Sequence, residues 1–451
     1  MKEIILNLKN KLRSNSALRK EILTISFPVM LQMLVEYLLN ITDTAFIGHY
    51  NIKALSAITS SIYPYFMLLS LFFSTSRGTT ILISQAIGGK RFKEARRHAE
   101  VSFIFNQLIS LLYFIIWIVA GRNIISLVGL KEDLLDMGSQ YISIISFQFL
   151  FFGLVISAES IFQGKGITYP IMIVSIVKTF LNIILDWLLI FGKFGLPELG
   201  IRGAALATLM SQIVSTTILL IFVFVIKKDF KLRIKGILRP NFFIYLKSLF
   251  IGIPAGVEFM LWVLGQNFLI LMLNKYNPVT TGIFGIFSII LNLTISLYFG
   301  ISIAAMNLVG KATGSNDPKM ALKVGNLCIL YSLIICFFIG IIFSFLPKAV
   351  FSIFTNDKKI IESYWYFIYI LVLIIFPTSL NVVGGNAIRG RGDTKWMLYT
   401  QIPGTIFIVI MVYIFIFVLK FGIGGVLLAI FIDELWRGIA NYLKFRLYYK
   451  N

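Results

Sequence analysis

The sequence predicts an all-α membrane protein with twelve transmembrane helices in two pseudo-symmetric six-helix lobes. Of its 451 residues, 58% are hydrophobic, whereas a soluble domain has roughly half or less, and the mean hydropathy is +0.88. Several motifs of the first half also return in the second half at one fixed distance. Chance similarity would drift in register, so a constant distance indicates two copies of one helical unit.

Twelve apolar runs have about the 20 residues that a helix needs to cross a bilayer. They cover residues 22–47, 54–76, 100–120, 140–162, 169–191, 201–226, 249–273, 280–309, 324–346, 362–388, 397–419 and 423–443. The runs are continuous rather than alternating, which excludes a transmembrane barrel.

Proline and glycine positions carry the repeat. Pro28 of the first run returns as Pro254 of the seventh, and 254 − 28 = 226. The same offset relates Gly88 to Gly314, Gly164 to Gly390, and Gly166 to Gly392. Chains made of two parallel halves are typical of transporters, whose substrate site lies between the halves. We therefore predict an N-terminal lobe at 1–226, a cytoplasmic linker at 227–248 and a C-terminal lobe at 249–451.

The formal net charge of +21 is concentrated on one side of the predicted membrane. Lys and Arg gather within residues 2–20, 90–97, 227–239, 311–323 and 389–395, and the opposite loops hold few. This positive-inside distribution places both termini in the cytoplasm. Membrane lipids with anionic headgroups are the expected partners of these loops, and nucleic acid is not.

The N-terminal residues, the cysteines and the histidines exclude several further features. Residues 1–20 lack the apolar stretch of a cleaved signal and are predicted to form a short amphipathic helix at the inner surface. Residues 240–248 are also expected at the surface. Cys328 and Cys336 both lie in the ninth run, and His49 and His98 lie in opposite aqueous loops. A disulfide framework or a metal site is therefore not expected, and neither is a cofactor.

Two runs carry polar side chains on one helix face. These are Gln32, Glu36, Asn40 and Asp43 in the first run, and Lys178, Asn182 and Asp186 in the fifth. A charge at the bilayer centre costs at least ~2.5 kcal/mol, so the stripes should face each other or a water-filled cavity. At mid-bilayer, Glu36 and Lys178 could form an ion pair. Toward the outer half, Asp43 and Asp186 with the Asn182 amide could exchange a proton or hold a monovalent cation.

The alternative interpretation of these stripes is a permanently buried polar network that only fixes helix packing. The positions 226 residues after Asp43, Asn182 and Asp186 hold Leu269, Ile408 and Val412. Coupling-ion chemistry is therefore expected in the first lobe alone. Glu258 corresponds to Gln32 and is a candidate for lining the central cavity. A local ion pair is expected among Asp433, Glu434 and Arg437, and an interfacial structural role for Glu159.

Five segments of the sequence resemble those of a known family. The segments FPVMLQ, ITDTAFIGHYNIKALSA, SQAIGGKRFKEA, NIILDWLLIFGKFGLPELGIRGAALATLMSQ and AIRGRGDTKWM are similar to those of multidrug and toxic compound extrusion (MATE) transporters. The resemblance covers nearly the whole chain. It implies a secondary-active antiporter that exports small organic, often cationic, compounds in exchange for H⁺ or Na⁺. A monomer in a prokaryotic plasma (inner) membrane is expected.

The resemblance also implies functional residues of the DinF-type branch. Asp43, Asn182 and Asp186 match its coupling positions, and Thr208 of GAALAT matches a threonine that joins them. Pro28 matches a helix-one proline whose bending is proposed to accompany protonation. The candidates for the cavity or substrate site are Gln32, Glu36, Asn40, Lys178, Gln212 and Glu258.

The sequence also departs from the family pattern. Trp187 replaces the usual proline after the helix-five aspartate, Trp262 stands where another branch has a glutamate, and Ile167 replaces an aspartate.

The sequence leaves two alternative functions. A lipid-linked oligosaccharide flippase of the same superfamily would need a larger and more cationic cavity, and Lys178 is the main intramembrane cation here. A membrane enzyme would need clustered catalytic groups or a GxxxxGK[ST] loop, and the sequence has neither.

Overall fold

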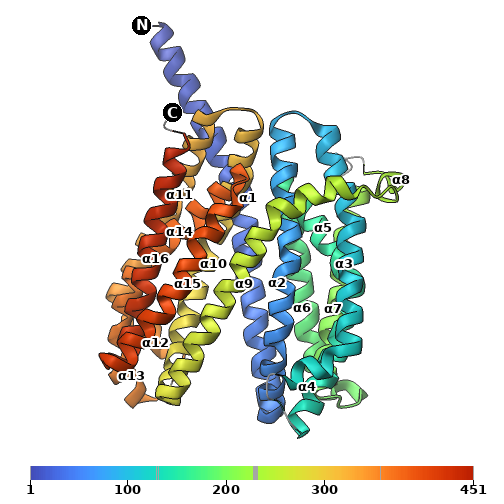
Figure 1. Cartoon of the computed structure of the whole chain (residues 1–451), viewed down its shortest axis with the longest axis vertical. Coiled ribbons are helices and arrows are strands. Elements are labelled where there is room, and N and C mark those ends of the chain that lie inside the picture. The colour runs from blue at the N-terminus through green and yellow to red at the C-terminus, as the bar shows by residue number, and fades with distance from the viewer. Residues whose placement is uncertain (1, 128–129, 131, 227–231, 356, 450–451) are drawn as a thin grey trace. The chain divides into compact units, whose positions relative to one another are not determined.

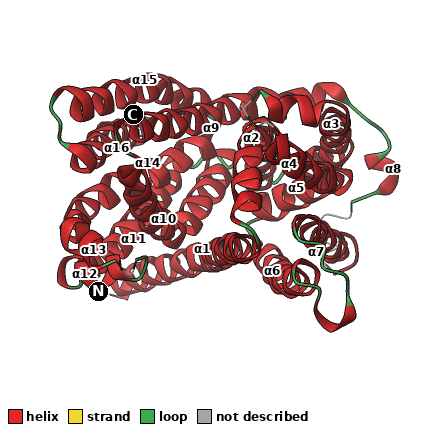
Figure 2. Ribbon diagram, turned by 90° about the horizontal axis from the view of Figure 1, so that it is seen from below, coloured by secondary structure: helices red, strands yellow, loops and turns green. Residues whose placement is uncertain are grey.

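A computed structural model describes residues 2–127, 130, 132–226, 232–355 and 357–449 (Figure 1, Figure 2). The first half contains α1 (Lys2–Tyr50), α2 (Ile52–Gly88), α3 (Phe92–Ser126), α4 (Glu132–Ile145), α5 (Phe149–Lys165), α6 (Tyr169–Ile190) and α7 (Ile201–Ile221). The short α8 (Ile234–Ile237) follows in the linker. The second half contains α9 (Phe242–Tyr276), α10 (Pro278–Gly314), α11 (Pro318–Phe345), α12 (Pro347–Ser352), α13 (Lys358–Tyr364), α14 (Ile368–Arg391), α15 (Thr394–Tyr413) and α16 (Gly422–Leu447).

Within the described residues, eleven helical stretches are long and apolar enough to cross a membrane. Two of them each join two α-helices, because α4 and α5 form one stretch (Asp133–Lys165) and α13 and α14 form another (Lys358–Arg391). The twelfth helix is α16, whose 26 residues are long enough to cross at ~1.5 Å per residue. Its charged side chains lower its hydropathy. The twelve predicted helices are confirmed.

Several predicted helix ends are wrong. The second helix was expected to end at 76 but continues to Gly88, and the third was expected to begin at 100 but begins at Phe92. Hydropathy locates the part of a helix that lies in hydrocarbon, whereas the backbone hydrogen bonds continue into polar surroundings. For the same reason, residues 242–248 form the first turns of α9. The first twenty residues are not a separate helix, because α1 is continuous from Lys2.

The chain divides into two compact units. The N-terminal unit comprises residues 31–87 and 91–257, and the C-terminal unit comprises residues 1–30, 88–90 and 258–451. These units differ from the predicted lobes at the start of each repeat. Helix α1 passes from one unit to the other two residues after Pro28, and α9 does so three residues after Pro254. Each unit therefore contains the opening stretch of the other repeat.

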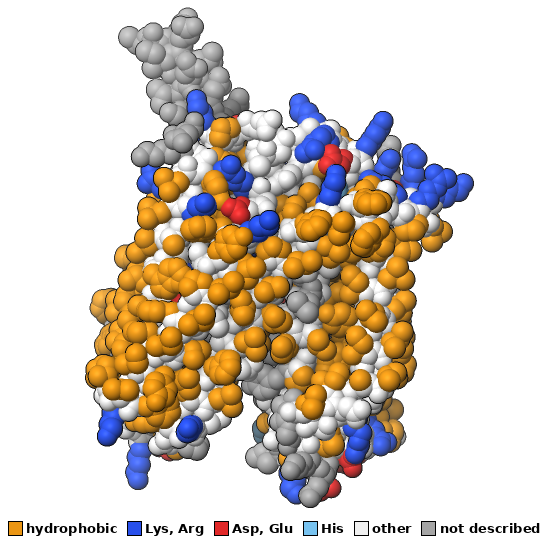
Figure 3. Space-filling model, in the orientation of Figure 1, with side chains coloured by type: hydrophobic (Ala, Val, Ile, Leu, Met, Phe, Trp, Pro, Cys, Tyr) orange, Lys and Arg blue, Asp and Glu red, His pale blue; other side chains and the backbone are white. Residues whose placement is uncertain are grey.

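Each unit is a helix bundle of its own. In the C-terminal unit, α14 packs against α10, α11 and α16 (Figure 2), and its core includes the fully buried Phe287, Tyr298 and Phe445. In the N-terminal unit, α3 packs on α5, and α7 packs on both α6 and α4. Lys and Arg side chains gather near the helix ends and apolar side chains cover the part between (Figure 3), as expected of membrane-spanning bundles.

The sequence repeat is also a structural repeat. Gly166 ends α5 with a φ of 78°, and Gly392 ends α14 with a φ of 99°. Glycine adopts this left-handed conformation without steric cost and is the common residue just past a helix end. Because 392 − 166 = 226, the same helix cap recurs at the repeat distance.

The first helix of each repeat packs closely against a helix of the unit that it joins, and a glycine lies at each of these two contacts. A Cβ atom added to Gly252 of α9 would overlap the backbone of Ser74 in α2, and one added to Gly300 of α10 would overlap the carbonyl oxygen of Ser26 in α1. Position 252 corresponds to position 26, and position 300 to position 74, at the 226-residue offset. The two crossings are therefore equivalent in the repeat. In one crossing the first helix of the repeat carries the glycine, and in the other crossing the second helix carries it.

Candidate functional site

The two polar stripes predicted from the sequence meet inside the N-terminal unit. Asp43 comes from α1 and Asp186 from α6, and their carboxyl groups lie within hydrogen-bonding reach of each other. Asp186 is 1% exposed, whereas Asp43 is partly buried. The pair is thus brought together by residues that lie far apart in the sequence.

The Asn182 amide joins this pair to a third helix. In the orientation that satisfies both of its ends, it donates to Asp43 Oδ1 (3.3 Å) and accepts from the Thr208 backbone N–H of α7 (3.2 Å). The Thr208 side chain donates to the Ala204 carbonyl (3.1 Å), and it also hydrogen-bonds Tyr141 of α4. All four residues predicted as a coupling site therefore lie together.

The predicted ion pair between Glu36 and Lys178 is wrong within the described residues. Glu36 Oε1 instead accepts hydrogen bonds from Gln32 Nε2 (3.0 Å) and from Ser175 Oγ (2.9 Å). Neutral donors thus hold the carboxyl group on the face of α6. The Lys178 charge acts on Asp43, so the lysine belongs with the acidic pair.

Three residues that lie close to these side chains were not predicted from the sequence to belong to the site. Ser175 lies one turn before Lys178 and could have been found by extending the stripe on α6 toward its start. Glu159 of α5 was expected to have only an interfacial structural role, yet it lies near both Glu36 and Lys178. Tyr141 lies near Asp43 and Asp186. No periodicity in the sequence indicates that α4 and α5 would contribute.

The remaining candidates are distributed more widely. Asn40 is exposed and donates to the Glu36 carbonyl on its own helix (3.0 Å), and buried Gln212 donates to Thr216 one turn away (3.4 Å). Glu258 belongs to the C-terminal unit, where Arg389 Nη2 donates to its Oε1 (2.5 Å). Pro28 lies inside α1.

The predicted ion pair in the last helix is confirmed. Arg437 contacts both Asp433 and Glu434 on α16, with 3.0 Å between Nη2 and Glu434 Oε1. Within the described residues, no group of three or more His, Cys, Asp or Glu side chains could hold a metal ion.

Comparison with known proteins places this chain in a family. The MatE family model matches residues 28–188 and 254–433. The chain belongs to the MatE family. The two matched stretches of this MatE protein begin at Pro28 and Pro254, the same two prolines that the repeat relates.

Relatives and solved structures agree with this assignment. The MatE protein is 30% identical over 382 residues to a probable multidrug resistance protein NorM of Thermotoga maritima, covering 84% of this chain and 81% of that one. It is 24% identical over 455 residues to the uncharacterized transporter YisQ of Bacillus subtilis, covering 97% and 98%. An outward-facing structure of a MATE family transporter of the MOP superfamily superposes with a TM-score of 0.87 at 21% identity, covering 96% of each chain. The twelve-helix, two-lobe fold is therefore shown.

Proposed function

We propose that this MatE protein is a multidrug efflux antiporter, which exports organic, often cationic, compounds in exchange for H⁺ or Na⁺ by alternating access. Family membership and a relative named as a probable multidrug resistance protein support export of small compounds. The protein acts as a monomer in the plasma membrane of a prokaryotic cell, with both termini cytoplasmic. In keeping with this, α1 begins and α16 ends at the same end of the C-terminal unit (Figure 1).

The observation that carries the coupling mechanism is the contact between Asp43 and Asp186. A hydrogen bond between two carboxyl groups needs one proton, and a monovalent cation held by both would serve the same purpose. When that ion leaves, the two carboxylates repel each other, by roughly 4 kcal/mol for charges 4 Å apart at an effective dielectric constant of 20. The repulsion favours separation of α1 from α6.

Asn182 transmits the change to α7, because its amide bonds both Asp43 and the Thr208 backbone. An ion that binds the packed arrangement more tightly than the separated one shifts the protein between two states, which coupling requires. Pro28 gives α1 a point at which it can bend. Beyond the coupling ion, the mechanism uses no cofactor.

Reconstitution into proteoliposomes tests the proposal. The accumulation of ethidium is measured under a pH gradient or a sodium gradient, each imposed separately. We expect one gradient to drive transport by the wild type, and D43N and D186N to abolish it. The matched control is D136N, whose target is 55% exposed and paired with Arg122, and which should transport normally. Undiminished transport by D43N would remove Asp43 from the mechanism, and failure of both gradients would overturn antiport.

A further inference from the structure

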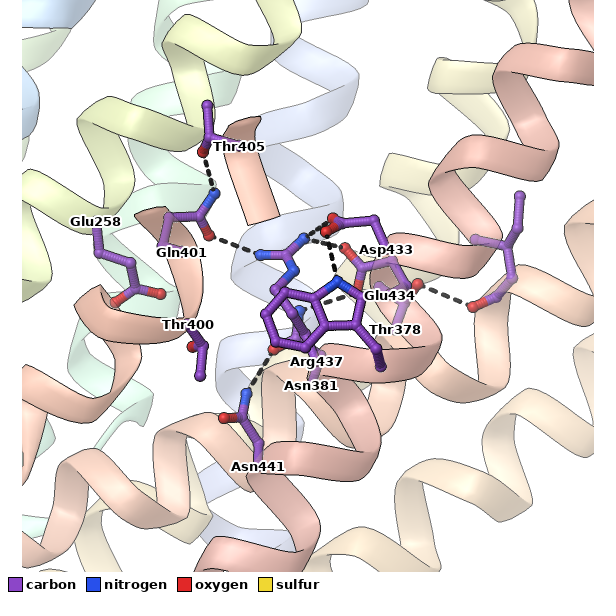
Figure 4. Close-up of polar contacts among 12 residues, drawn as sticks. Glu258, Thr378, Asn381, Thr400, Gln401, Thr405, Asp433, Glu434, Arg437 and Asn441 are labelled. Carbon is purple, nitrogen blue, oxygen red and sulfur yellow. Dashed lines mark hydrogen bonds and ion pairs between the residues drawn. The ribbon is translucent and has the colours of Figure 1, made fainter. Parts of the chain in front are cut away.

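The C-terminal unit holds a second cluster of charged side chains, which the proposed coupling mechanism does not use (Figure 4). Arg437 is 6% exposed and Asp433 is 2% exposed. The Arg437 guanidinium contacts both neighbouring carboxyl groups of α16, at 3.0 Å for Glu434, and its Nη1 donates to Gln401 Oε1 of α15 (2.6 Å). Three charged residues are thus fixed at the centre of a helix bundle.

The cluster has one more acidic group than it has basic groups. Its other partners are neutral, because Asn381 Nδ2 donates to Glu434 Oε2 (2.9 Å) and Trp436 Nε1 donates to Asp433 Oδ1 (3.2 Å). An unbalanced charge within the membrane is costly. A positively charged ligand would balance the second carboxyl group.

A small cavity gives that charge a place to bind. The lining consists of Trp262, Gly265, Gln266, Gln401, Gly404, Thr405, Ile408, Ile430, Asp433, Glu434 and Arg437. Its volume of about 30 Å³ has room for about two groups the size of a water molecule. An ammonium group fits this space, whereas the whole of a drug-sized compound does not. Trp262, which is 38% exposed, offers an aromatic face to the body of a larger ligand.

A further carboxyl group beside this cluster has an unpartnered oxygen. Glu258 is 9% exposed, and its Oε2 is buried without a hydrogen-bond partner. It lies one helical turn before Trp262 on the same face of α9, its carboxyl group points toward the side of Gln401 and Thr400 (Figure 4), and its charge acts on Arg437. Arg389 pairs with Oε1 of this carboxylate, so only Oε2 lacks a donor, and a buried acceptor that lacks a donor indicates a missing hydrogen-bonding partner.

The repeat places this cavity at the position of the first site. Residues 36, 40, 175, 178, 182 and 208 of the N-terminal unit correspond, at the 226-residue offset, to residues 262, 266, 401, 404, 408 and 434, all of which line the cavity. Glu36 has become Trp262, Lys178 has become Gly404, and Thr208 has become Glu434. Both repeats therefore keep polar chemistry at one place, with the charges moved to the last helix in the second copy.

We propose that this cavity is a second ligand site, which binds the ammonium group of an organic cation. Glu434 and Asp433 supply the negative charge, and Arg437 positions both carboxyl groups and limits the site to one positive charge. The Trp262 ring packs on the body of the ligand, and a cation near an aromatic face gains roughly 0.5–2 kcal/mol. The choice of an organic cation rests on the proposed export function.

Equilibrium binding of dansylcadaverine, a primary ammonium with an aromatic body, tests the site. Fluorescence anisotropy is measured with the purified full chain in the D43N/D186N background, so that the first acidic pair cannot contribute. We expect E434Q and W262L each to raise the dissociation constant at least tenfold. The matched control is E362Q, because Glu362 is 62% exposed and paired with Lys348. It should change the constant less than twofold, and dansylamide, which lacks the ammonium group, should bind at least tenfold more weakly.

Each outcome bears on the proposal. Should E434Q fail to fold, as judged by gel filtration and circular dichroism, W262L decides, because it alters only the cavity wall. Unchanged affinity in the folded variants would overturn the site, even if the wild type transports. Equal binding of dansylamide, or displacement of the probe by sodium alone, would overturn the assignment of an ammonium ligand. A wild type that does not transport, with binding still lost in E434Q, would sink the antiport proposal and leave this site standing.

Discussion

The crossing of α9 over α2 gives a quantitative test of how the N-terminal unit is packed. A Cβ atom at Gly252 would overlap the carbonyl oxygen of Ser74 and would lie 2.7 Å from its carbonyl carbon, which is about 0.7 Å closer than the 3.4 Å at which ordinary contact begins. The obstacle is backbone in the middle of a helix, so it cannot rotate away as a side chain can. Overpacking of this kind costs about 1–3 kcal/mol, and the helix propensity gained by replacing glycine with alanine is at most about 1 kcal/mol.

We therefore expect Gly252→Ala to destabilise the protein by about 1–2 kcal/mol. The matched control is Gly282→Ala in α10, where an added Cβ would meet nothing within 4 Å. The control should leave stability unchanged or raise it by up to about 1 kcal/mol. Stability is read as the apparent melting temperature of the purified protein in detergent. Equal melting temperatures for the two variants would show that α9 and α2 do not touch through their backbones.

Three other changes test separate contacts. Arg97→Ala should speed tryptic cleavage within residues 232–241, because Arg97 Nη1 donates to the Gly236 carbonyl at 2.6 Å. Arg91→Ala, which removes an exposed ion pair, should not change the cleavage rate. Equal cleavage rates in the two variants would show that Arg97 does not hold this segment. Asp393→Ala removes the cap that accepts from the Trp396 N–H at 3.2 Å and should cost about 1 kcal/mol in detergent melting experiments, whereas an unchanged melting temperature would contradict the cap. Arg389→Met should lower the free energy of unfolding by about 3–5 kcal/mol, because it leaves the buried Glu258 carboxylate unpaired. Adding Glu258→Gln should restore part of the lost stability. A double variant that is no more stable than Arg389→Met would argue against the ion pair.

The sequence was sufficient to single out Asp43, Asn182 and Asp186 because lipid penalises exposed polar groups, whereas Thr208 was predicted only from the family resemblance. Polar residues spaced three and four apart on an apolar helix must avoid lipid, so periodicity predicts that the stripes on α1 and α6 face each other or a water-filled cavity. The same argument predicted the twelve helices, since the hydrocarbon thickness fixes their length. What periodicity reports is which face of a helix is buried, and at what depth.

Other features could not be read in this way. The approach of Glu159 and Tyr141 to the site depends on which helices are neighbours, which no single-helix pattern contains. Glu36 has Gln32 and Ser175 as donors, and the choice between them and Lys178 is set by rotamers. The correspondence between Glu434 and Thr208 could not be recognised from the sequence for another reason. The two positions are related by the repeat, but they hold different residue types.

The exchange of opening stretches between the two units has a consequence for biosynthesis. When the first six transmembrane helices have been inserted, the N-terminal unit still lacks residues 242–257 if these have not yet been made. Among these are Ser248 and Gly252, whose backbones close the crossing with α2. Residues 1–30 have no packing partners in their own unit until the helices of the C-terminal unit are made. Neither half of the gene product can finish assembly alone, so a chain severed between 232 and 241 should regain its native form only when both fragments are inserted into the same membrane.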